Sequence, residues 1–326
     1  MKNIAIIGAG ELGSRHLQSF ATFREPLRIQ VVDPNAGALV KARERFDDVQ
    51  NGTSTHLSAT FLEELDDLER EIDLAIIATT ANVRLTVLQK LVALKQVRFL
   101  ILEKVAFQSQ AECESALNLI KGAGIEAWVN CPRRLYPVYN ELKKRFENEK
   151  ISSIKVTGIN WGMACNSVHF LDLFAYLSSS TDYKIDTGML ENRIKESKRS
   201  GFLEVLGCIT GAFENGVEFE LECIESDAPP RVQIHINSIN FNITVNEALG
   251  ELTITDLRNR ETKTNKFSLP YQSSLSASVA SDILSSGRCA LPSIEDAVSI
   301  HIPYLNALQH HIGMVLGKDI KCCPIT

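Results

Sequence analysis

The chain has 326 residues, of which 44% are hydrophobic and 23% are charged, and this length and composition are typical of a globular protein with two domains. It carries 34 basic and 40 acidic residues without any basic cluster, so we expect no nucleic acid as a partner. The sequence has no cleavable leader and no run of apolar residues long enough to cross a membrane, so we expect a soluble, cytoplasmic protein with no membrane partner.

Short apolar segments alternate with helical patterns over the first 126 residues. Strands are expected at 3–8, 27–33, 74–79 and 98–103, with helices between them. The strands are apolar at nearly every position, which is the pattern of a parallel sheet covered by helices on both faces. This part of the chain predicts a doubly wound α/β domain.

The pattern changes after residue 126. Helices and a strand alternate over 136–177, and the segment 203–268 contains strands with little helix between them. Turn signals separate these strands, so we expect a mainly antiparallel sheet, followed by two closing helices. The sequence therefore predicts a first domain at 1–126 and a second α/β domain at 127–326.

A glycine-rich turn follows the first expected strand. Gly8, Gly10 and Gly13 form a G-x-G-x-x-G pattern at the start of a helix. Glycines let a pyrophosphate approach the backbone, and the helix amino terminus supplies N–H groups to bind it. The turn also occurs for packing reasons alone, but here it has a strand before it and a helix after it. The predicted dinucleotide contacts in this turn are Gly8, Ala9, Gly10, Glu11, Leu12 and Gly13.

Asp33 ends the second strand about 20 residues after the glycine turn, where a carboxylate can accept hydrogen bonds from the adenosine ribose. Such a carboxylate repels the 2′-phosphate of NADP, and the residues that follow, 34–37, include no arginine to bind that phosphate. The sequence therefore favours NAD over NADP as the cofactor.

Glu103 and Lys104 come at the end of the apolar strand at 98–103. Charged residues in this position are often part of a solvated turn. They also lie at the carboxyl edge of the sheet, where α/β sheets bind ligands, and this position favours a functional role.

Motifs along the whole chain resemble those of one family. His16 follows the glycine turn, IIATTANVR lies at 76–84, EKV at 103–105, RRLYP at 133–137 and CNSVHFLD at 165–172. They are similar to the I-I-A-T-P-x-x-x-H, E-K-P, R-x-x-P and D-x-x-x-H-x-x-D motifs of the Gfo/Idh/MocA family of NAD(P)-dependent oxidoreductases. The segment GMACNSVHFLDL also resembles members of a branch associated with bacterial surface-sugar biosynthesis.

The resemblance implies a Rossmann domain followed by an α/β domain with a large open sheet, which commonly forms a dimer interface, and a substrate bound between the domains. It implies hydride transfer between NAD and a carbinol or carbonyl carbon of a sugar, sugar nucleotide or polyol. Further cofactor contacts are expected at Thr79, Thr80, Asn82, Glu103 and Lys104. Substrate contacts are expected at Arg134, Asn166 and Asp172.

Lys104 and His169 are the residues expected to handle the proton. His169 is assigned as general acid/base because its reference pKa lies near 6.5, and Lys104 would bind the reacting oxygen. A lysine beside the cationic nicotinamide has a lowered pKa, so the two roles can be exchanged. Outside the family pattern, His169 would instead be a helix cap or a core histidine. Asp172 is expected either to contact substrate or to hold His169, and Arg134 either to meet a substrate anion or to brace the domain junction.

Two departures from the family pattern lead to expectations of their own. Val105 stands where the family has proline, and since a cis bond before a non-proline residue costs about 3 kcal/mol, a trans bond is expected between Lys104 and Val105. Cys165 stands where the family has aspartate, so a proton-relay carboxylate is missing and Asn166 is expected to take over its hydrogen bonds.

Two other functions are compatible with these features. One is a redox-assisted glycosidase that retains NAD, and the other is a non-catalytic sensor that binds dinucleotide and sugar. The presence of both Lys104 and His169 favours the dehydrogenase. The eight cysteines and seven histidines show no zinc-ligand spacing, so no metal is expected.

Overall fold

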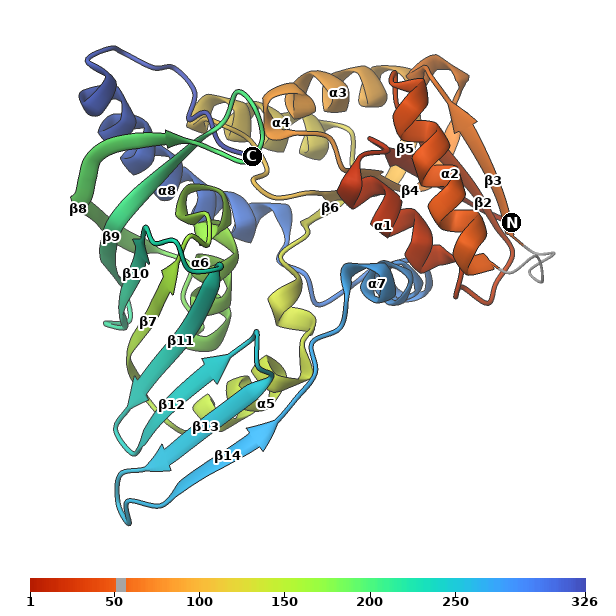
Figure 1. The fold of residues 1–326 in the computed structure, drawn as a ribbon. Helices are drawn as coiled ribbons and strands as arrows, with labels where there is room; N and C mark the ends of the chain where they lie inside the picture. Colours follow the sequence, from red (N-terminus) through yellow and green to blue (C-terminus); the bar gives the residue numbers. More distant parts are fainter. Residues whose placement is uncertain (51–56) are drawn as a thin grey trace. The chain divides into compact units, whose positions relative to one another are not determined.

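The computed structural model describes residues 1–50 and 57–326, and the chain divides into two compact units (Figure 1). Unit 1 comprises Met1–Phe107, Ala111–Pro132 and Pro270–Glu295. Unit 2 comprises Gln108–Gln110, Arg133–Leu269 and Asp296–Thr326. The division therefore differs from the one expected at residue 126, chiefly because a segment from late in the chain belongs to unit 1.

Unit 1 contains a six-stranded parallel sheet in the order β3-β2-β1-β4-β5-β6. Its strands are β1 (Lys2–Ile7), β2 (Leu27–Val32), β3 (Leu57–Leu62), β4 (Glu71–Ile77), β5 (Gln96–Leu102) and β6 (Glu126–Val129). The strand order reverses direction between β1 and β4, which is the switch point of a doubly wound sheet. The predicted Rossmann fold is confirmed.

Helices cover both faces of this sheet. They are α1 (Glu11–Phe20), α2 (Ala36–Gln50), α3 (Ala81–Leu94), α4 (Gln110–Gly122) and α7 (Gln272–Ser286), with a short 3-10 turn, η1 (Leu65–Asp67), before β4. Because βαβ crossovers are right-handed, the reversal of strand order places α1 and α2 on one face and α3 and α4 on the other. Helix α7 packs beside α1 (Figure 1). Cover on both faces explains why β1, β4 and β5 each end in four consecutive apolar residues.

Unit 2 contains an eight-stranded sheet in the order β14-β13-β12-β11-β7-β10-β9-β8. Its strands are β7 (Ile151–Ile159), β8 (Tyr183–Glu196), β9 (Leu203–Phe213), β10 (Glu218–Ile224), β11 (Arg231–Ser238), β12 (Phe241–Asn246), β13 (Glu251–Asp256) and β14 (Thr262–Lys266). Strands β7 and β10 pair in parallel and the other neighbours pair antiparallel, so the sheet is mainly antiparallel, as predicted.

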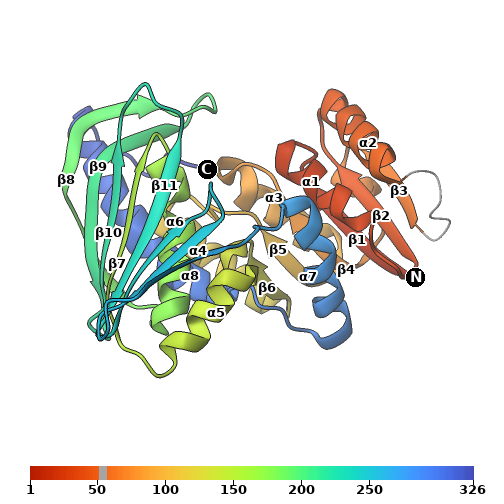
Figure 2. The same cartoon turned by 60° about the horizontal axis from the view of Figure 1, so that its bottom comes forward.

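One face of the second sheet is covered by helices and the other carries polar side chains. The helices are α5 (Pro137–Phe146), α6 (Met163–Ser178) and α8 (Ile294–Leu316), and η2 (Pro132–Leu135) precedes α5 (Figure 2). Along β7, Ile154 and Val156 are fully buried, whereas Lys155 and Thr157 between them are not. This alternation is the signature of a sheet with one covered face. In the described part of the chain, no helix has both the length and the apolar character needed to cross a membrane.

Candidate functional site

The carboxyl ends of the central strands of unit 1 line up at one edge of the sheet. Ile7, Ile77 and Leu102, the last residues of β1, β4 and β5, are partners across the sheet. Just beyond them, the Ala78 N–H donates to the Ile7 carbonyl (2.7 Å) and the Glu103 N–H donates to the Ile77 carbonyl (3.1 Å). The loops after the three strands therefore start side by side, at the edge where such sheets bind ligands.

The three glycines of the first loop have different structural roles. Gly8 has a φ of +99°, and a Cβ there would lie 2.9 Å from the Thr79 nitrogen. A Cβ on Gly13 would lie 1.7 Å from the Gly8 oxygen, so the helix could not pack against the turn. Gly10 is exposed, and a Cβ there would meet nothing within 4 Å. Packing therefore requires Gly8 and Gly13, whereas the space in front of Gly10 is open.

This open space lies at the amino terminus of α1, where Gly10 is the N-cap and no side chain caps the helix. Free N–H groups and the helix dipole favour an anion at this position. The Glu11 carboxylate, which would repel an anion, is bound by Arg45 of α2 at 2.8 Å. The turn thus fits the pyrophosphate of a dinucleotide.

Asp33 follows β2 and holds the glycine turn. Its carboxylate accepts a hydrogen bond from the Ala9 N–H (2.7 Å) and another from the Asn35 N–H (2.8 Å). Asp33 is partly exposed, so its carboxylate has a structural role and can also meet a ribose hydroxyl.

The loop after β4 carries three of the expected cofactor residues. Thr79 and Thr80 are partly exposed, and Asn82 is exposed in the first turn of α3. Gly8 approaches this loop closely, as its contact with the Thr79 nitrogen indicates. The structure therefore brings these residues to the same sheet edge as the glycine turn.

Glu103, by contrast, points into unit 1 and is only 2% exposed. His16 Nε2 lies 2.8 Å from Glu103 Oε1, and the Asn130 side-chain amide donates to the same oxygen (2.6 Å). Burial by itself raises the pKa of the Glu103 carboxyl, but these hydrogen bonds bring that pKa below its ordinary value. Glu103 is therefore a buried carboxylate that anchors the loop after β5.

The hydrogen-bond chain continues beyond His16 to helix α7. His16 Nδ1 lies 2.7 Å from the Ser276 hydroxyl oxygen, which also accepts from the Gln272 side-chain amide (3.1 Å). An ionised Glu103 can only accept, so His16 donates to it through Nε2. A segment from late in the chain thus helps to orient Glu103.

Arg84 of α3 binds the loops after β4 and β5. It is 1% exposed. Its guanidinium donates through Nη2 to the Thr79 carbonyl and through Nη1 to the carbonyls of Val105 and Ala106, the last at 2.9 Å. The side chain of Lys104 is partly exposed in a stretch, residues 101–109, that is otherwise buried.

The peptide bond between Lys104 and Val105 is cis, so the expected trans bond is wrong. That expectation counted only the intrinsic preference of the bond. It omitted the tertiary contacts of the loop, in which Val105 is fully buried and Arg84 binds the carbonyls of Val105 and Ala106.

In unit 2, Arg134 and Asp172 bind each other. The Arg134 guanidinium donates to both carboxylate oxygens at 2.7 to 3.0 Å, and Asp172 is 1% exposed. Burial raises the pKa of Asp172 to about 6, because desolvation outweighs the attraction of Arg134. Arg134 was expected either to bind a substrate anion or to have a structural role, and this pairing fits the structural role, in which Arg134 joins η2 to α6.

The neighbouring arginine makes a second, partly buried ion pair that was not predicted from the sequence. Arg133 donates to both carboxylate oxygens of Glu247 (2.7 and 2.9 Å), and the Tyr139 hydroxyl donates to the same carboxylate (2.6 Å). The adjacent arginines of the RRLYP motif are thus tied to two different elements of unit 2.

His169, Asn166 and Cys165 lie on α6. His169 is partly buried, one turn before Asp172, and Cys165 is buried. The Asn166 side-chain amide donates to the Trp161 carbonyl (2.8 Å), at the start of the helix. Unit 2 therefore places all the expected substrate residues on α6 or against it.

Asn130 was also missed, although its position carries a signal. Its N–H donates to the Leu102 carbonyl (2.8 Å), one residue beyond β6, so it occupies the same edge as the predicted residues. Asn130 directly follows the segment that forms β6, so the rule that ligands bind at the carboxyl edge of a parallel sheet could have identified it. Ser276 carries no such signal, because its partner His16 is 260 residues away. Within the described residues, no group of three or more His, Cys, Asp or Glu side chains is placed to hold a metal ion.

Comparison with known proteins gives a family model that matches part of the chain and a fold that matches nearly all of it. Residues 2–131 match the GFO_IDH_MocA model, described as an oxidoreductase family with an NAD-binding Rossmann fold. No curated protein matches the chain significantly.

Three solved structures are similar over nearly the whole length of the chain. UDP-N-acetylglucosamine 3-dehydrogenase GnnA from Acidithiobacillus ferrooxidans is 15% identical with a TM-score of 0.71, covering 94% of this chain and 96% of that one. Levoglucosan dehydrogenase, in complex with NADH and levoglucosan, is 16% identical with a TM-score of 0.72, covering 96% and 98%. A super-repressor mutant of Gal80p from Saccharomyces cerevisiae is 13% identical with a TM-score of 0.72, covering 98% and 97%. At these identities the similarity establishes the fold alone.

Proposed function

We propose that the protein is an NAD-dependent dehydrogenase or reductase, because residues 2–131 match the model of an oxidoreductase family with an NAD-binding Rossmann fold. Its substrate would be a sugar, sugar nucleotide or polyol, oxidised at a CH–OH carbon or reduced at the matching carbonyl. The observation that carries the proposal is the open, anion-favouring space in front of Gly10 at the amino terminus of α1. Two structures of similar fold are named as dehydrogenases of UDP-N-acetylglucosamine and of levoglucosan, which supports a sugar-like substrate.

NAD is the proposed form of the cofactor. The Asp33 carboxylate ends β2 beside the glycine turn, and it would meet the 2′-phosphate of NADP with like charge. The bound nicotinamide would supply the hydride acceptor or donor.

Lys104 and His169 are the proposed proton-handling residues. Lys104 has a partly exposed side chain on a loop whose neighbouring residues are buried, so its ammonium group can reach a ligand while its backbone is held. In the oxidation direction, the ammonium would stabilise negative charge developing on the substrate oxygen while His169 accepts the hydroxyl proton. His169 lies in unit 2, on the helix that carries the other proposed substrate residues, Asn166 and Asp172.

A substrate screen tests the activity. The purified protein is incubated with sugars, polyols and nucleotide sugars together with NAD or NADP, and formation of reduced nicotinamide is followed by absorbance. We expect turnover with NAD, and we expect Lys104→Ala to reduce kcat by at least about 100-fold, the size of a general acid/base or electrostatic contribution. The matched control is Lys121→Ala, which removes an exposed lysine from α4 in the same unit. Equal activity of Lys104→Ala and wild type would remove Lys104 from the mechanism.

A second candidate function is a dinucleotide-dependent regulator without catalysis. It is supported by the similarity in fold to a super-repressor mutant of Gal80p and by Cys165 in the position of the family aspartate. The same screen separates the two functions. Tight NADH binding without turnover on any substrate class would favour the regulator, whereas net production of NADH would favour the dehydrogenase.

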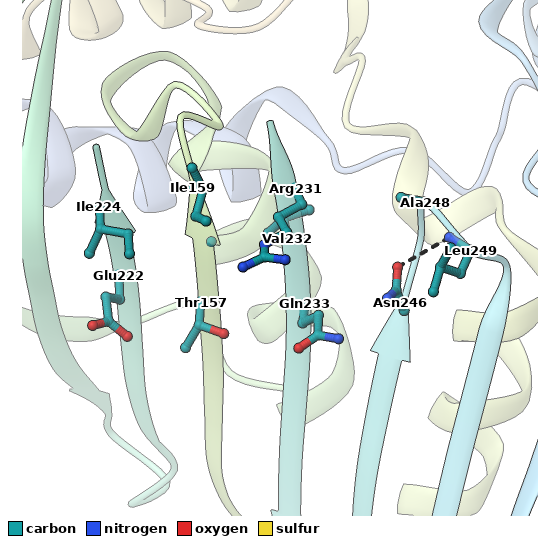
Figure 3. Close-up of a pocket in the computed structure, with 11 residues that line it drawn as sticks. Thr157, Ile159, Glu222, Ile224, Arg231, Val232, Gln233, Asn246, Ala248 and Leu249 are labelled. Atoms are coloured by element: carbon teal, nitrogen blue, oxygen red, sulfur yellow. Dashed lines mark hydrogen bonds between the residues drawn. The ribbon is translucent and has the colours of Figure 1, made fainter. Parts of the chain in front are cut away.

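We also propose that two copies associate through the open face of the unit 2 sheet. Figure 3 shows a hollow on this face lined by side chains of β7, β10 and β11 and of the β12–β13 turn. Ile224 and Leu249 in this hollow are 47% and 61% exposed, and Glu222 and Arg231 lie around them. Exposed apolar side chains within a polar surround are typical of an interface between proteins.

A further inference from the structure

Resting on the function proposed above, we propose that Arg84 is a positioning residue for the reaction. It would act through Lys104, by holding the two loops that lie beside the glycine turn. Arg84 stands where the family motif has histidine, and no role was predicted for it. All the residues that carry this proposal belong to unit 1.

The first observation is that a single guanidinium binds two different loops. Arg84 donates to the Thr79 carbonyl in the loop after β4 and to the carbonyls of Val105 and Ala106 in the loop after β5. Thr79 adjoins Gly8 of the glycine turn, so the arginine ties the dinucleotide-binding turn and the Lys104 loop into one assembly.

The second observation is that both chain neighbours of Lys104 are anchored. On one side, Glu103 is buried and bound by His16 and Asn130. On the other side, the Val105 side chain is fully buried and its carbonyl is bound by Arg84. The Lys104 side chain therefore extends from a backbone that is held at both ends.

The chemistry of arginine suits this task. Its planar guanidinium presents several N–H donors in a fixed geometry, so it can bind several carbonyls at once, whereas a lysine ammonium is a compact charge on a flexible stem. The positive charge of Arg84 also helps to lower the pKa of the buried Glu103 carboxyl, after the larger effects of His16 and Asn130. Arg84 thus contributes to both anchors of Lys104.

Three variants test the proposal: Arg84→Met, Arg84→Lys and the control Arg98→Met. Methionine removes the charge and the hydrogen bonds to the carbonyls of Thr79, Val105 and Ala106. Lysine keeps the charge but lacks the planar group that presents several N–H donors. Arg98 is an exposed arginine near the start of β5, at the far end of the strand from Lys104. Circular dichroism and thermal unfolding report on whether each variant is folded.

Two measurements read out positioning. Hydrogen exchange with mass spectrometry compares the segments 78–83 and 103–107 with the rest of unit 1, and fluorescence titration gives the Kd for NADH. We expect both Arg84 variants to exchange faster in these two segments. We expect the Kd for NADH to change by a smaller factor than kcat, because the glycine turn and Asp33 that would hold the dinucleotide remain and only the expected contacts at Thr79, Thr80 and Asn82 are loosened. If the wild type turns over a substrate, kcat should fall by about 100-fold, since a displacement of about 1 Å can have an effect of that size.

The outcomes separate this proposal from the proposed function. Unchanged exchange in both segments, or a kcat equal to that of Arg98→Met, would overturn the role of Arg84 in a folded variant. If Arg84→Met does not fold, Arg84→Lys decides by the same two measurements, and a lysine variant with wild-type exchange and activity would overturn the proposal. If the wild type binds NADH but turns over no substrate, the proposed function fails, while faster exchange at 103–107 would still support Arg84 as the residue that holds the Lys104 loop.

Discussion

A methyl group on Gly13 would lie 1.7 Å from the carbonyl oxygen of Gly8, whereas one on Gly10 would meet no atom within 4 Å. The two glycines belong to one motif, but only Gly13 is required by the packing of the free protein. Packing does not explain the glycine at position 10, whereas the proposed pyrophosphate site would, so the two positions can be separated by experiment.

We predict that Gly10→Ala keeps the stability of the wild type but weakens NADH binding at least about 10-fold, because the new methyl group enters the space proposed for the pyrophosphate. We predict that Gly13→Ala lowers the free energy of unfolding by about 1–3 kcal/mol or more, since the turn must move away from the helix. Urea denaturation and fluorescence titration with NADH measure the two effects. Wild-type affinity in Gly10→Ala would contradict the assignment of the pyrophosphate site.

At the scale of elements, η2 and α6 are joined by Arg134 and Asp172. The pair is buried, and the pKa of Asp172 is raised to about 6 by desolvation. A carboxyl group whose pKa is higher in the folded than in the unfolded state binds its proton more tightly when folded. Its contribution to stability is therefore largest below its ordinary pKa of about 3.9 and decreases as the pH rises through 6.

We predict that Arg134→Met lowers the free energy of unfolding at pH 8 by about 3–5 kcal/mol, because it leaves a buried carboxylate without its partner. The loss should become smaller as the pH falls below 6, since Asp172 can then be neutral. The double variant Arg134→Met/Asp172→Asn should recover part of the stability at pH 8. Urea denaturation across this pH range measures the effect, and a loss that does not depend on pH would contradict a role for Asp172 ionisation.

The elements also differ in how far they could be predicted. Strands β1, β2, β4 and β5 were expected from their apolar runs, because burial on both faces leaves a local pattern in the sequence. Helix α7 was expected as a helix, but its place in unit 1 was not. Two hydrogen bonds join it to α1, one between Ser276 and His16 and one from the Ala277 N–H to the Ser19 hydroxyl (2.8 Å). Residues so far apart in the chain leave no periodic signal in the sequence.

At the scale of the whole molecule, the proposed dimer makes a prediction about mass. A single chain has a mass of 36.2 kDa, and we expect sedimentation of the wild type at twice that mass. Leu249→Asp should shift the equilibrium toward the single chain, because it places a charge in the exposed apolar part of the proposed interface. Met314→Asp is the control, since Met314 is also exposed but lies on α8. A wild type that sediments as a single chain would contradict the dimer.

The sequence by itself determined the doubly wound sheet, the glycine turn and the carboxylate at Asp33. Each of these depends on residues that are close together in the chain or that repeat with the period of a strand or helix. Local physical chemistry, such as the steric freedom of glycine and burial on two faces, is enough to specify them.

Only the tertiary structure decided how the loop around Lys104 is held. Glu103 receives hydrogen bonds from residues 87 and 27 positions away, and Arg84 reaches carbonyl groups in a loop after the next strand. The local rule predicted a trans bond at Val105, and the structure has a cis bond there. The physical reason is that a local preference of a few kcal/mol is outweighed when burial and several hydrogen bonds from distant residues act on the same loop.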